Sequence, residues 1–286
     1  MIGFNVQQTK RHFTEVLTES FSRREAEQLM RILLEDLFDI DLKRQLMEPN
    51  LRIDEWQYHQ LEEAVKRLLS GEPVQYVTGV ARFSDLLIKV SPAVLIPRPE
   101  TEELVQKICA SLPKEKSIRI WDIGTGSCCI AIALAKHFEN AEVIAFDVSE
   151  AALQIAKENA ESNGVKVTFV QDDVLNPTSE FFDQPVDLVV SNPPYVCDNE
   201  RAAMERNVVD WEPENALFVP DDDPLRFYRQ IVLLAKDKIT LEGQIWFEIN
   251  EQMGQEMLQL CHETGFAQTE ILEDFAGKPR FCRIVR

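Results

Sequence analysis

The residues Asn192-Pro193-Pro194-Tyr195 place a carboxamide, two prolines and an aromatic ring directly after an apolar segment. A tight turn would account for the prolines, because each proline fixes its own backbone dihedral. It would not account for the polar amide and the ring on either side of them. The stretch therefore predicts a rigid turn that presents Asn192 and Tyr195 to a ligand, with a purely structural strand exit as the alternative.

A glycine-rich loop lies upstream, between an apolar segment and a helical one. Glycine permits a tight turn and lets a ligand approach the backbone, and free N–H groups at the start of a helix favour electronegative groups. A dinucleotide fingerprint would require a third glycine farther on, and residues 127–131 do not supply it, so a nicotinamide cofactor is disfavoured. We expect the loop to bind a cofactor through Gly124, Thr125, Gly126, Ser127 and Cys128.

Acidic residues end the next two apolar segments. Asp147 lies about 20 residues beyond the loop, where a carboxylate can accept hydrogen bonds from both hydroxyls of a ribose. Asp173 could accept from an exocyclic amine, while Val174 packs on the ring. Each acid alone would be an ordinary cap or loop residue, but together they indicate one cleft at the carboxyl ends of parallel strands. Because no lysine or arginine follows the loop, an adenosine-bearing cofactor without phosphate fits best.

The elements that must position these residues form three parts. Residues 1–73 have helical spacing, as Phe13, Val16 and Leu17 show, and predict a small helical bundle. Residues 74–95 alternate loosely around Thr78-Gly79 and predict a β-hairpin linker. From 96 to 286, apolar strands alternate with amphipathic helices, which predicts an α/β domain with a mostly parallel sheet covered on both faces. The expected strands are 118–123, 141–146, 165–170, 186–191, 243–249, 267–272 and 281–285, and the expected helices are 128–138, 149–164, 224–239 and 251–265.

The glycine loop and the acids resemble the Rossmann-like class I methyltransferases that use S-adenosylmethionine. Its sulfonium is a cation, which suits an acidic site better than a pyrophosphate would. Methyltransferases that act on a planar nitrogen of adenine, cytosine or the glutamine side chain carry a tetrapeptide of this type. There the Asn192 side-chain carbonyl and the Pro193 backbone carbonyl would accept from the two N–H bonds of the substrate, and Tyr195 would cover the planar group. Positioning and charge neutralisation would then give the rate without a strong base.

Further motifs extend the resemblance over almost the whole chain. The stretches "EPVQYVTG", "LIPRPETEELV", "DIGTGSCCIAIALA", "SNPPYV", "EPENAL" and "GQIWFEI" resemble the protein-(glutamine) methyltransferases that modify peptide chain release factors. The resemblance implies methyl transfer to the side-chain amide nitrogen of the glutamine in a Gly-Gly-Gln loop, with S-adenosylhomocysteine as product and the N-terminal helices as a substrate-recognition domain. It assigns the cofactor to residues 124–128, Asp147, Asp173, Val174 and Asn192. It assigns the substrate to Asn192, Pro193, Pro194 and Tyr195, with Asn192, Pro193 and Tyr195 as catalytic residues.

Three residues near these motifs need separate interpretation. Cys128 stands where the family usually has glycine or alanine, so we expect its thiol to narrow the pocket for the methionine part of the cofactor. Arg98 could face the substrate or form a structural ion pair with Glu100 or Glu102. Glu248 ends a strand and is expected to be architectural.

Composition restricts the alternatives. The formal net charge is −19, and a protein that neutralises nucleic-acid phosphates would show a basic patch, so a nucleic-acid methyltransferase and direct nucleic-acid binding are disfavoured. An inactive adapter that only binds translation factors is the rival from another class. The six cysteines form no C-x-x-C pair and the four histidines are scattered, so no metal site is expected. We expect a cytoplasmic protein without membrane segments, and the composition does not indicate its oligomeric state.

Overall fold

The computed structural model describes residues 3–286, which fall into two compact units. The first comprises the residues up to 80 together with Glu205–Trp211, and the second comprises Ala81–Met204 and Glu212–Arg286. Among the residues described, no helix is both long and apolar enough to span a membrane. The six cysteines are unpaired, and no cluster of metal-binding side chains occurs within 3–286.

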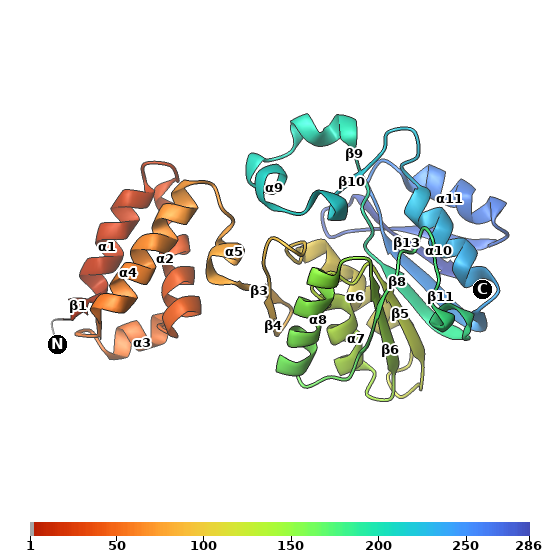
Figure 1. Ribbon diagram of the computed structural model, residues 1–286, viewed down its shortest axis with the longest axis horizontal. Coiled ribbons are helices and arrows are strands. Elements are labelled where there is room, and N and C mark those ends of the chain that lie inside the picture. The colour runs from red at the N-terminus through yellow and green to blue at the C-terminus, as the bar shows by residue number, and fades with distance from the viewer. Residues whose placement is uncertain (1–2) are drawn as a thin grey trace. The chain divides into compact units, whose positions relative to one another are not determined.

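The first unit is the predicted helical bundle, in which α1, α2 and α4 run alongside one another (Figure 1). Phe13 and Leu17 are buried in its core and Val16 packs against it, which confirms the helical face predicted there. Capping boxes start α2 at Ser22 and α4 at Asp54, where side chain and backbone satisfy each other's free groups. The elements of this unit are β1 (Phe4–Asn5), α1 (Val6–Leu17), α2 (Arg23–Phe38), α3 (Leu42–Met47), β2 (Arg52–Ile53), α4 (Glu55–Leu69), α5 (Val74–Thr78) and α9 (Arg206–Trp211).

The predicted hairpin exists, but its position was wrong. Residues Val74–Thr78 form the short helix α5, and the hairpin pairs β3 (Val80–Phe83) with β4 (Leu86–Lys89). Its turn contains Ser84 in the left-handed region, with φ 54°, instead of Thr78-Gly79. Arg67 explains the helix, because its guanidinium donates to the backbone carbonyls of Tyr76 and Val77 and forms an ion pair with Glu72. A charged side chain thus satisfies carbonyls that a short helix leaves free.

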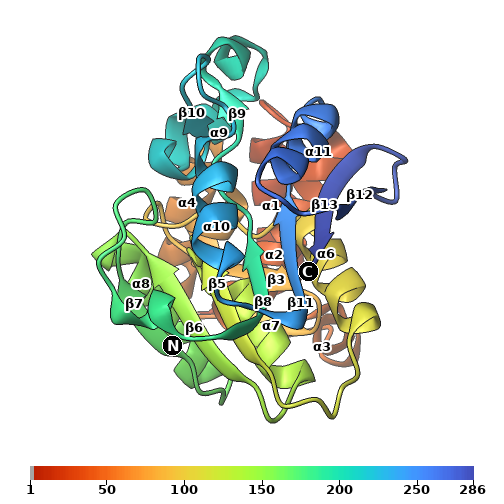
Figure 2. The ribbon, with the colours of Figure 1, turned by 90° about the vertical axis from the view of Figure 1, so that its right-hand side faces the viewer.

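The second unit is built on a seven-stranded sheet with the order β12-β13-β11-β8-β5-β6-β7 (Figure 2). Neighbours from β11 to β7 run parallel, and β13 and β12 add to that edge antiparallel, so the predicted mostly parallel sheet is confirmed. The strands are β5 (Arg119–Ile123), β6 (Glu142–Asp147), β7 (Thr168–Gln171), β8 (Val186–Ser191), β11 (Ile239–Glu248), β12 (Gln268–Glu273) and β13 (Pro279–Val285).

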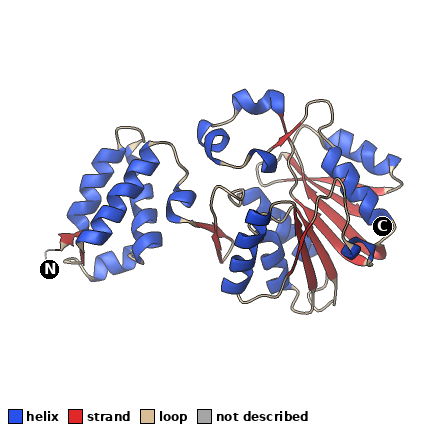
Figure 3. Cartoon of the chain, viewed as in Figure 1, coloured by secondary structure: helices blue, strands red, loops and turns tan. Residues whose placement is uncertain are grey.

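Helices cover both faces of this sheet, as the alternation of strands and helices predicted (Figure 3). One face packs against α6 (Pro99–Ser111), α7 (Cys129–His137) and α8 (Glu150–Ser162), and the other against α10 (Arg226–Lys236) and α11 (Gly254–Glu263). The core between sheet and helices includes Trp121, Phe146, Phe247 and Tyr228, each at most 1% exposed. Short elements lie on either side of β8 in the chain. The element η1 (Glu180–Asp183) precedes β8, and β9 (Val196–Cys197), η2 (Asp198–Ala203), η3 (Glu214–Ala216) and β10 (Phe218–Val219) lie between β8 and α10.

Candidate active site

The site forms at the carboxyl ends of the central strands, where the order of the sheet reverses. After β5 the chain continues into β6 on one side, whereas β8 pairs with β5 on the other side. Such a switch point leaves a crevice above the strand ends. In register, Ser191 of β8 pairs with Ile123 of β5 and with Phe247 of β11. The residue after Ser191 is therefore level with Gly124 on one side and with Glu248 on the other.

The glycine loop follows β5 and is attached to β6. The backbone N–H groups of Gly124 and Thr125 both donate to the Phe146 carbonyl, each at 2.9 Å. Gly124 and Gly126 have φ of 74° and 53°, in the left-handed region that favours glycine. Adjacent residues aside, no atom of residues 3–286 lies within 4 Å of where a Cβ would project from either glycine. The loop backbone therefore borders open space in which a ligand can lie, while the N–H groups of Gly124 and Thr125 stay bonded to the Phe146 carbonyl.

Asp147 connects the loop to the start of α8. One carboxylate oxygen accepts from the Gly126 N–H and the other from the Ser149 N–H, each at 2.9 Å. Burial raises the pKa of Asp147, while these backbone hydrogen bonds oppose the rise. Each carboxylate oxygen has a further lone pair beyond these bonds. The residue can therefore accept from a pair of neighbouring hydroxyls as well as hold the loop.

Two carboxylates, Asp172 and Asp173, follow β7 and have different hydrogen-bond partners. Asp172 accepts from the backbone N–H groups of Thr178 and Ser179 and so organises the following loop. Asp173 accepts from the Leu175 N–H at 2.9 Å and from the Asn176 side chain at 2.8 Å. Both line the cavity, but much of their acceptor capacity is used within the chain.

The corner after β8, residues 192–195, is connected by hydrogen bonds to β11 and to α6. The Asn192 amide nitrogen donates to the Thr101 hydroxyl at 3.2 Å, and that hydroxyl donates to a Glu248 carboxylate oxygen at 2.6 Å. The Tyr195 hydroxyl donates to the other Glu248 oxygen at 3.1 Å. Burial raises the pKa of Glu248, and the hydrogen bonds from Thr101 and Tyr195 and the charge of Arg280 oppose that rise.

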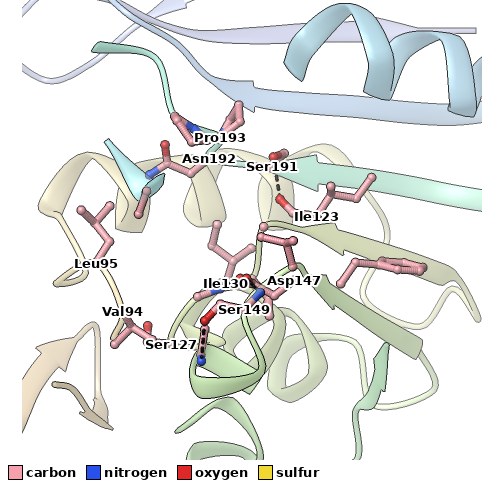
Figure 4. Close-up of a pocket in the computed structure, with 18 of the residues that line it drawn as sticks. Val94, Leu95, Ile123, Ser127, Ile130, Asp147, Ser149, Ser191, Asn192 and Pro193 are labelled. Atoms are coloured by element: carbon pink, nitrogen blue, oxygen red, sulfur yellow. Dashed lines mark hydrogen bonds between the residues drawn. The ribbon is translucent and has the colours of Figure 1, made fainter. Parts of the chain in front are cut away.

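Together the loop, the acids and the corner line one cavity with about 1090 Å³ of space between atoms, its open mouth included. Figure 4 shows Asn192 and Pro193 on one side of it, and Ser127, Ile130, Asp147 and Ser149 on another. Apolar side chains supply much of the remaining wall, including Ile123, Phe146, Val148, Val174, Phe227 and Ile231. Of the sequence-predicted residues, the cavity is lined by Gly124, Thr125, Gly126, Ser127, Asp147, Asp173, Val174, Asn192, Pro193 and Pro194.

Two predicted residues do not line this cavity. Cys128 has a fully buried side chain and a left-handed backbone with φ 69°, and it is not part of the cavity wall, whereas Cys129 lines the cavity. The expected narrowing by the Cys128 thiol is therefore not observed. Tyr195 packs against the core, and its hydroxyl is bonded to Glu248 instead of covering the cavity.

Several residues important to the site were not predicted. The buried Asn159 side chain donates to the Ser127 carbonyl at 2.9 Å and pairs with both backbone groups of Lys89, which fixes the glycine loop against β4. No role was predicted for Thr101, and Glu248 was expected to be architectural. A polar side chain at the end of an otherwise apolar strand was the available signal for Glu248.

Arg98 lines the cavity but forms an ion pair with a residue distant in the sequence. Its guanidinium is 2.5 Å from Glu212, whose carboxylate also accepts from the Ile96 N–H. The expected ion pair exists, but the partner is Glu212 instead of Glu100 or Glu102. Among the described residues that line the cavity, Arg98 is the single cationic side chain, and its charge is neutralised.

The cavity suits a cationic adenosine derivative better than a dinucleotide. Asp147, Asp172 and Asp173 contribute negative charge, while the one arginine is paired, so a pyrophosphate would meet no free cation. Asp147 can accept from ribose hydroxyls, and Val148 and Val174 offer apolar surface to a planar base. The residues present therefore fit S-adenosylmethionine.

Fold and site together define a class I methyltransferase, with S-adenosylmethionine as the methyl donor. The Methyltransferase small domain family matches residues 102–210, and the PrmC N-terminal domain family matches residues 8–79. A release factor glutamine methyltransferase of Bacteroides thetaiotaomicron is 40% identical over 94% of this chain and 96% of its own length. One from Flavobacterium psychrophilum is 38% identical over 98% of both chains. The chain belongs to the family of release factor glutamine methyltransferases.

Solved structures agree with the fold assignment. A methyltransferase from Pyrococcus furiosus superposes with a TM-score of 0.53 at 16% identity, over 78% of this chain and 98% of that one. A Thermus thermophilus 16S rRNA N2 G1207 methyltransferase, in complex with S-adenosylmethionine and guanosine, gives 0.52 at 16% identity, over 72% of this chain and 49% of that one. At these identities the likeness concerns the fold alone.

Proposed function

We propose that this enzyme transfers the methyl group of S-adenosylmethionine to the side-chain amide nitrogen of the glutamine in the Gly-Gly-Gln loop of a peptide chain release factor. The observation that carries the proposal is the position of Asn192 and Pro193 in the same cavity as the glycine loop and Asp147. The family membership supports the substrate class, since the relatives are named for release factors and glutamine. Such a substrate places the reaction in the cytoplasm, where translation factors act.

The cofactor is held by the loop, the acids and the apolar wall. Asp147 accepts from the ribose hydroxyls while its bonds to Gly126 and Ser149 keep the loop in place. Val174 packs on the adenine, and Asp173 accepts from its exocyclic amine. The backbone of residues 124–127 borders the methionine part of the cofactor. When bound, the cofactor supplies an electrophilic methyl group on a positively charged sulfur.

The substrate glutamine is held by the corner after β8. An amide nitrogen is a poor nucleophile because its lone pair is delocalised into the carbonyl group. The Asn192 side-chain oxygen and the Pro193 backbone carbonyl accept from its two N–H bonds, so the nitrogen is oriented and its electron density rises. Pro194 keeps the backbone rigid. Tyr195 acts through its bond to Glu248, which holds the corner in place.

The N-terminal unit is the part that we assign to recognition of the release factor, together with the hairpin that leads into the catalytic domain. The basis is the separate matching of residues 8–79 and 102–210 by two different domain families. The chain provides no basic run longer than two residues, so we propose a protein partner without direct nucleic-acid contact.

A labelling experiment tests the proposed function. The purified enzyme is incubated with radiolabelled S-adenosylmethionine and a release factor, in parallel with the same factor carrying Gln→Ala in its Gly-Gly-Gln loop. We expect label on the first factor and none on the second. Equal labelling of both would place the target elsewhere, and absence of label on either would favour an inactive adapter. A binding measurement with both factors then shows whether association alone persists.

A further inference from the structure

We propose that Thr101 and Glu248 are positioning residues that set which way the Asn192 carboxamide faces. This inference rests on the proposed function, because orientation matters only if Asn192 must present an acceptor to a substrate N–H. A carboxamide has an oxygen on one side and an NH₂ group on the other, and the two are nearly equal in shape. Only its oxygen can accept from the glutamine nitrogen, so the enzyme needs a device that distinguishes the two orientations.

The device begins at Glu248, which is 1% exposed at the end of β11. As a carboxylate it can only accept hydrogen bonds. One oxygen faces the Thr101 hydroxyl at 2.6 Å and the other faces the Tyr195 hydroxyl at 3.1 Å. Both hydroxyl protons must therefore point at Glu248. The short distance to Thr101 is typical of a hydrogen bond between a hydroxyl and a charged acceptor.

The Thr101 hydroxyl links Glu248 to Asn192. A hydroxyl has one proton, and Thr101 gives it to Glu248, so toward Asn192 it offers only lone pairs. The Asn192 group that faces it at 3.2 Å must then be the NH₂ donor. The carboxamide oxygen consequently lies on the side of the group away from Thr101. The Glu248 carboxylate thus determines where the Thr101 proton points, and the Thr101 hydroxyl in turn determines the orientation of the Asn192 amide.

The strands make this relay rigid. Thr101 is 3% exposed in the first turn of α6, and the register of β8 with β11 brings Asn192 level with Glu248. The Tyr228 hydroxyl donates to the Glu248 backbone carbonyl at 3.0 Å, which holds the end of β11 from the opposite side. Thr101 and Glu248 lie 147 residues apart in the sequence, so only the folded sheet assembles the relay.

Without the Thr101 hydroxyl, neither orientation of the amide is preferred. The flipped form would present an NH₂ group to a substrate nitrogen that itself carries N–H bonds, and two donors do not bind one another. The release factor is held over a surface much larger than one carboxamide, so its KM should change little. The loss should appear in kcat, because the contact that is lost acts on the reacting nitrogen.

The test compares Thr101→Val, which keeps the shape and removes the hydroxyl, with Thr101→Ser, which restores the hydroxyl. We expect Thr101→Val to lower kcat for release factor methylation by about 3- to 10-fold, the effect of one hydrogen bond, with KM within twofold. Thr101→Ser should recover most of kcat. Thr264→Val is the matched control, because it removes another buried hydroxyl that bonds only to carbonyls in α11, remote from the cavity. Its kcat should equal that of the unaltered enzyme.

The outcomes separate the inference from the proposed function. If the unaltered enzyme labels the factor and Thr101→Val retains its kcat, the relay is refuted while the function stands. A failure of Thr101→Ser to recover kcat would also refute it, because packing and not the hydroxyl would then be responsible. If the unaltered enzyme does not label the Gly-Gly-Gln loop at all, the proposed function fails instead. Should Thr101→Val not fold, Thr101→Ala gives the same comparison with Thr101→Ser.

Discussion

The stability of the catalytic domain should depend on pH through one aspartate behind the glycine loop. Asp122 is fully buried in β5, where one oxygen accepts from the Thr125 hydroxyl at 2.6 Å and the other has no partner within the described chain. Burial is the main cause that raises the pKa of Asp122 from 3.8 to about 7, and the Thr125 bond opposes it. The buried carboxyl is therefore protonated near pH 5 in the folded state, whereas it is ionised there in the unfolded chain.

The sign and size follow from this difference in bound protons. Since the pKa of Asp122 is higher in the folded state, its contribution favours folding at low pH and is lost as the pH rises toward about 7. Between pH 5 and 7 the unfolded group is already ionised, so the loss covers about two pH units. At about 1.4 kcal/mol per unit, it amounts to about 2.7 kcal/mol as an upper bound. Asp122→Asn removes the ionisable group while keeping an acceptor for Thr125.

Urea unfolding measures this contribution through tryptophan fluorescence, to which Trp121, the buried neighbour of Asp122 in β5, contributes. Between pH 5 and pH 8, the stability of Asp122→Asn relative to the unaltered enzyme should rise by up to about 2.7 kcal/mol. The free energy of unfolding of the variant is compared with that of the unaltered enzyme at pH 5 and again at pH 8. A cost of the substitution that is the same at both pH values cancels when the two comparisons are subtracted. Asp237→Asn, which removes an exposed charge from the same unit, is the control. A difference for Asp122→Asn that stays constant from pH 5 to pH 8 would refute the reasoning.

Three further predictions concern the cavity. Asn192→Ala should lower turnover by about 10²-fold or more while leaving S-adenosylhomocysteine affinity largely unchanged by calorimetry, and surviving turnover would contradict its role. Asp147→Asn replaces one acceptor with a donor opposite a backbone N–H, so cofactor affinity should weaken by about 10- to 100-fold; titration showing less than a twofold change would count against it. Arg98→Ala leaves the Glu212 carboxylate buried without its cation, so thermal unfolding should show a loss of about 2 kcal/mol, with part of it recovered when Glu212→Ala is added.

Local patterns in the sequence predicted the features that depend on neighbouring residues. Apolar alternation predicted the strands of the sheet, and the glycine spacing predicted a loop whose φ angles of 74° and 53° require that residue type. The hairpin turn was misplaced because Gly79 is a strong turn signal, although here it ends α5, while the real turn uses Ser84 at an unusual φ. Propensity alone did not indicate the tertiary bonds of Arg67 that stabilise the short helix α5.

The parts that could not be predicted depend on pairs of residues far apart in the chain. Glu248 had no visible partner in the sequence, because Thr101 and Tyr195 come near it only through the order and register of β8, β11 and α6. Tyr195 was expected over the cavity on the basis of its type. The direction of its ring is determined by the Glu248 carboxylate, which is buried and needs a donor. The sequence motifs thus predicted the location of the site, whereas the order and register of the strands determine which side chains face the cavity.

The order of the strands explains why an Asn-Pro-Pro-Tyr corner is placed after β8. This strand lies between β5, which ends in the glycine loop, and β11, which ends in Glu248. A residue placed directly after β8 is therefore adjacent to the cofactor loop on one side and to a buried acceptor on the other. Any other strand of the sheet would supply at most one of these neighbours. Asn192 can thus be held by Glu248 through Thr101 while it faces the methyl donor's cavity, and the two prolines prevent the chain from leaving that position.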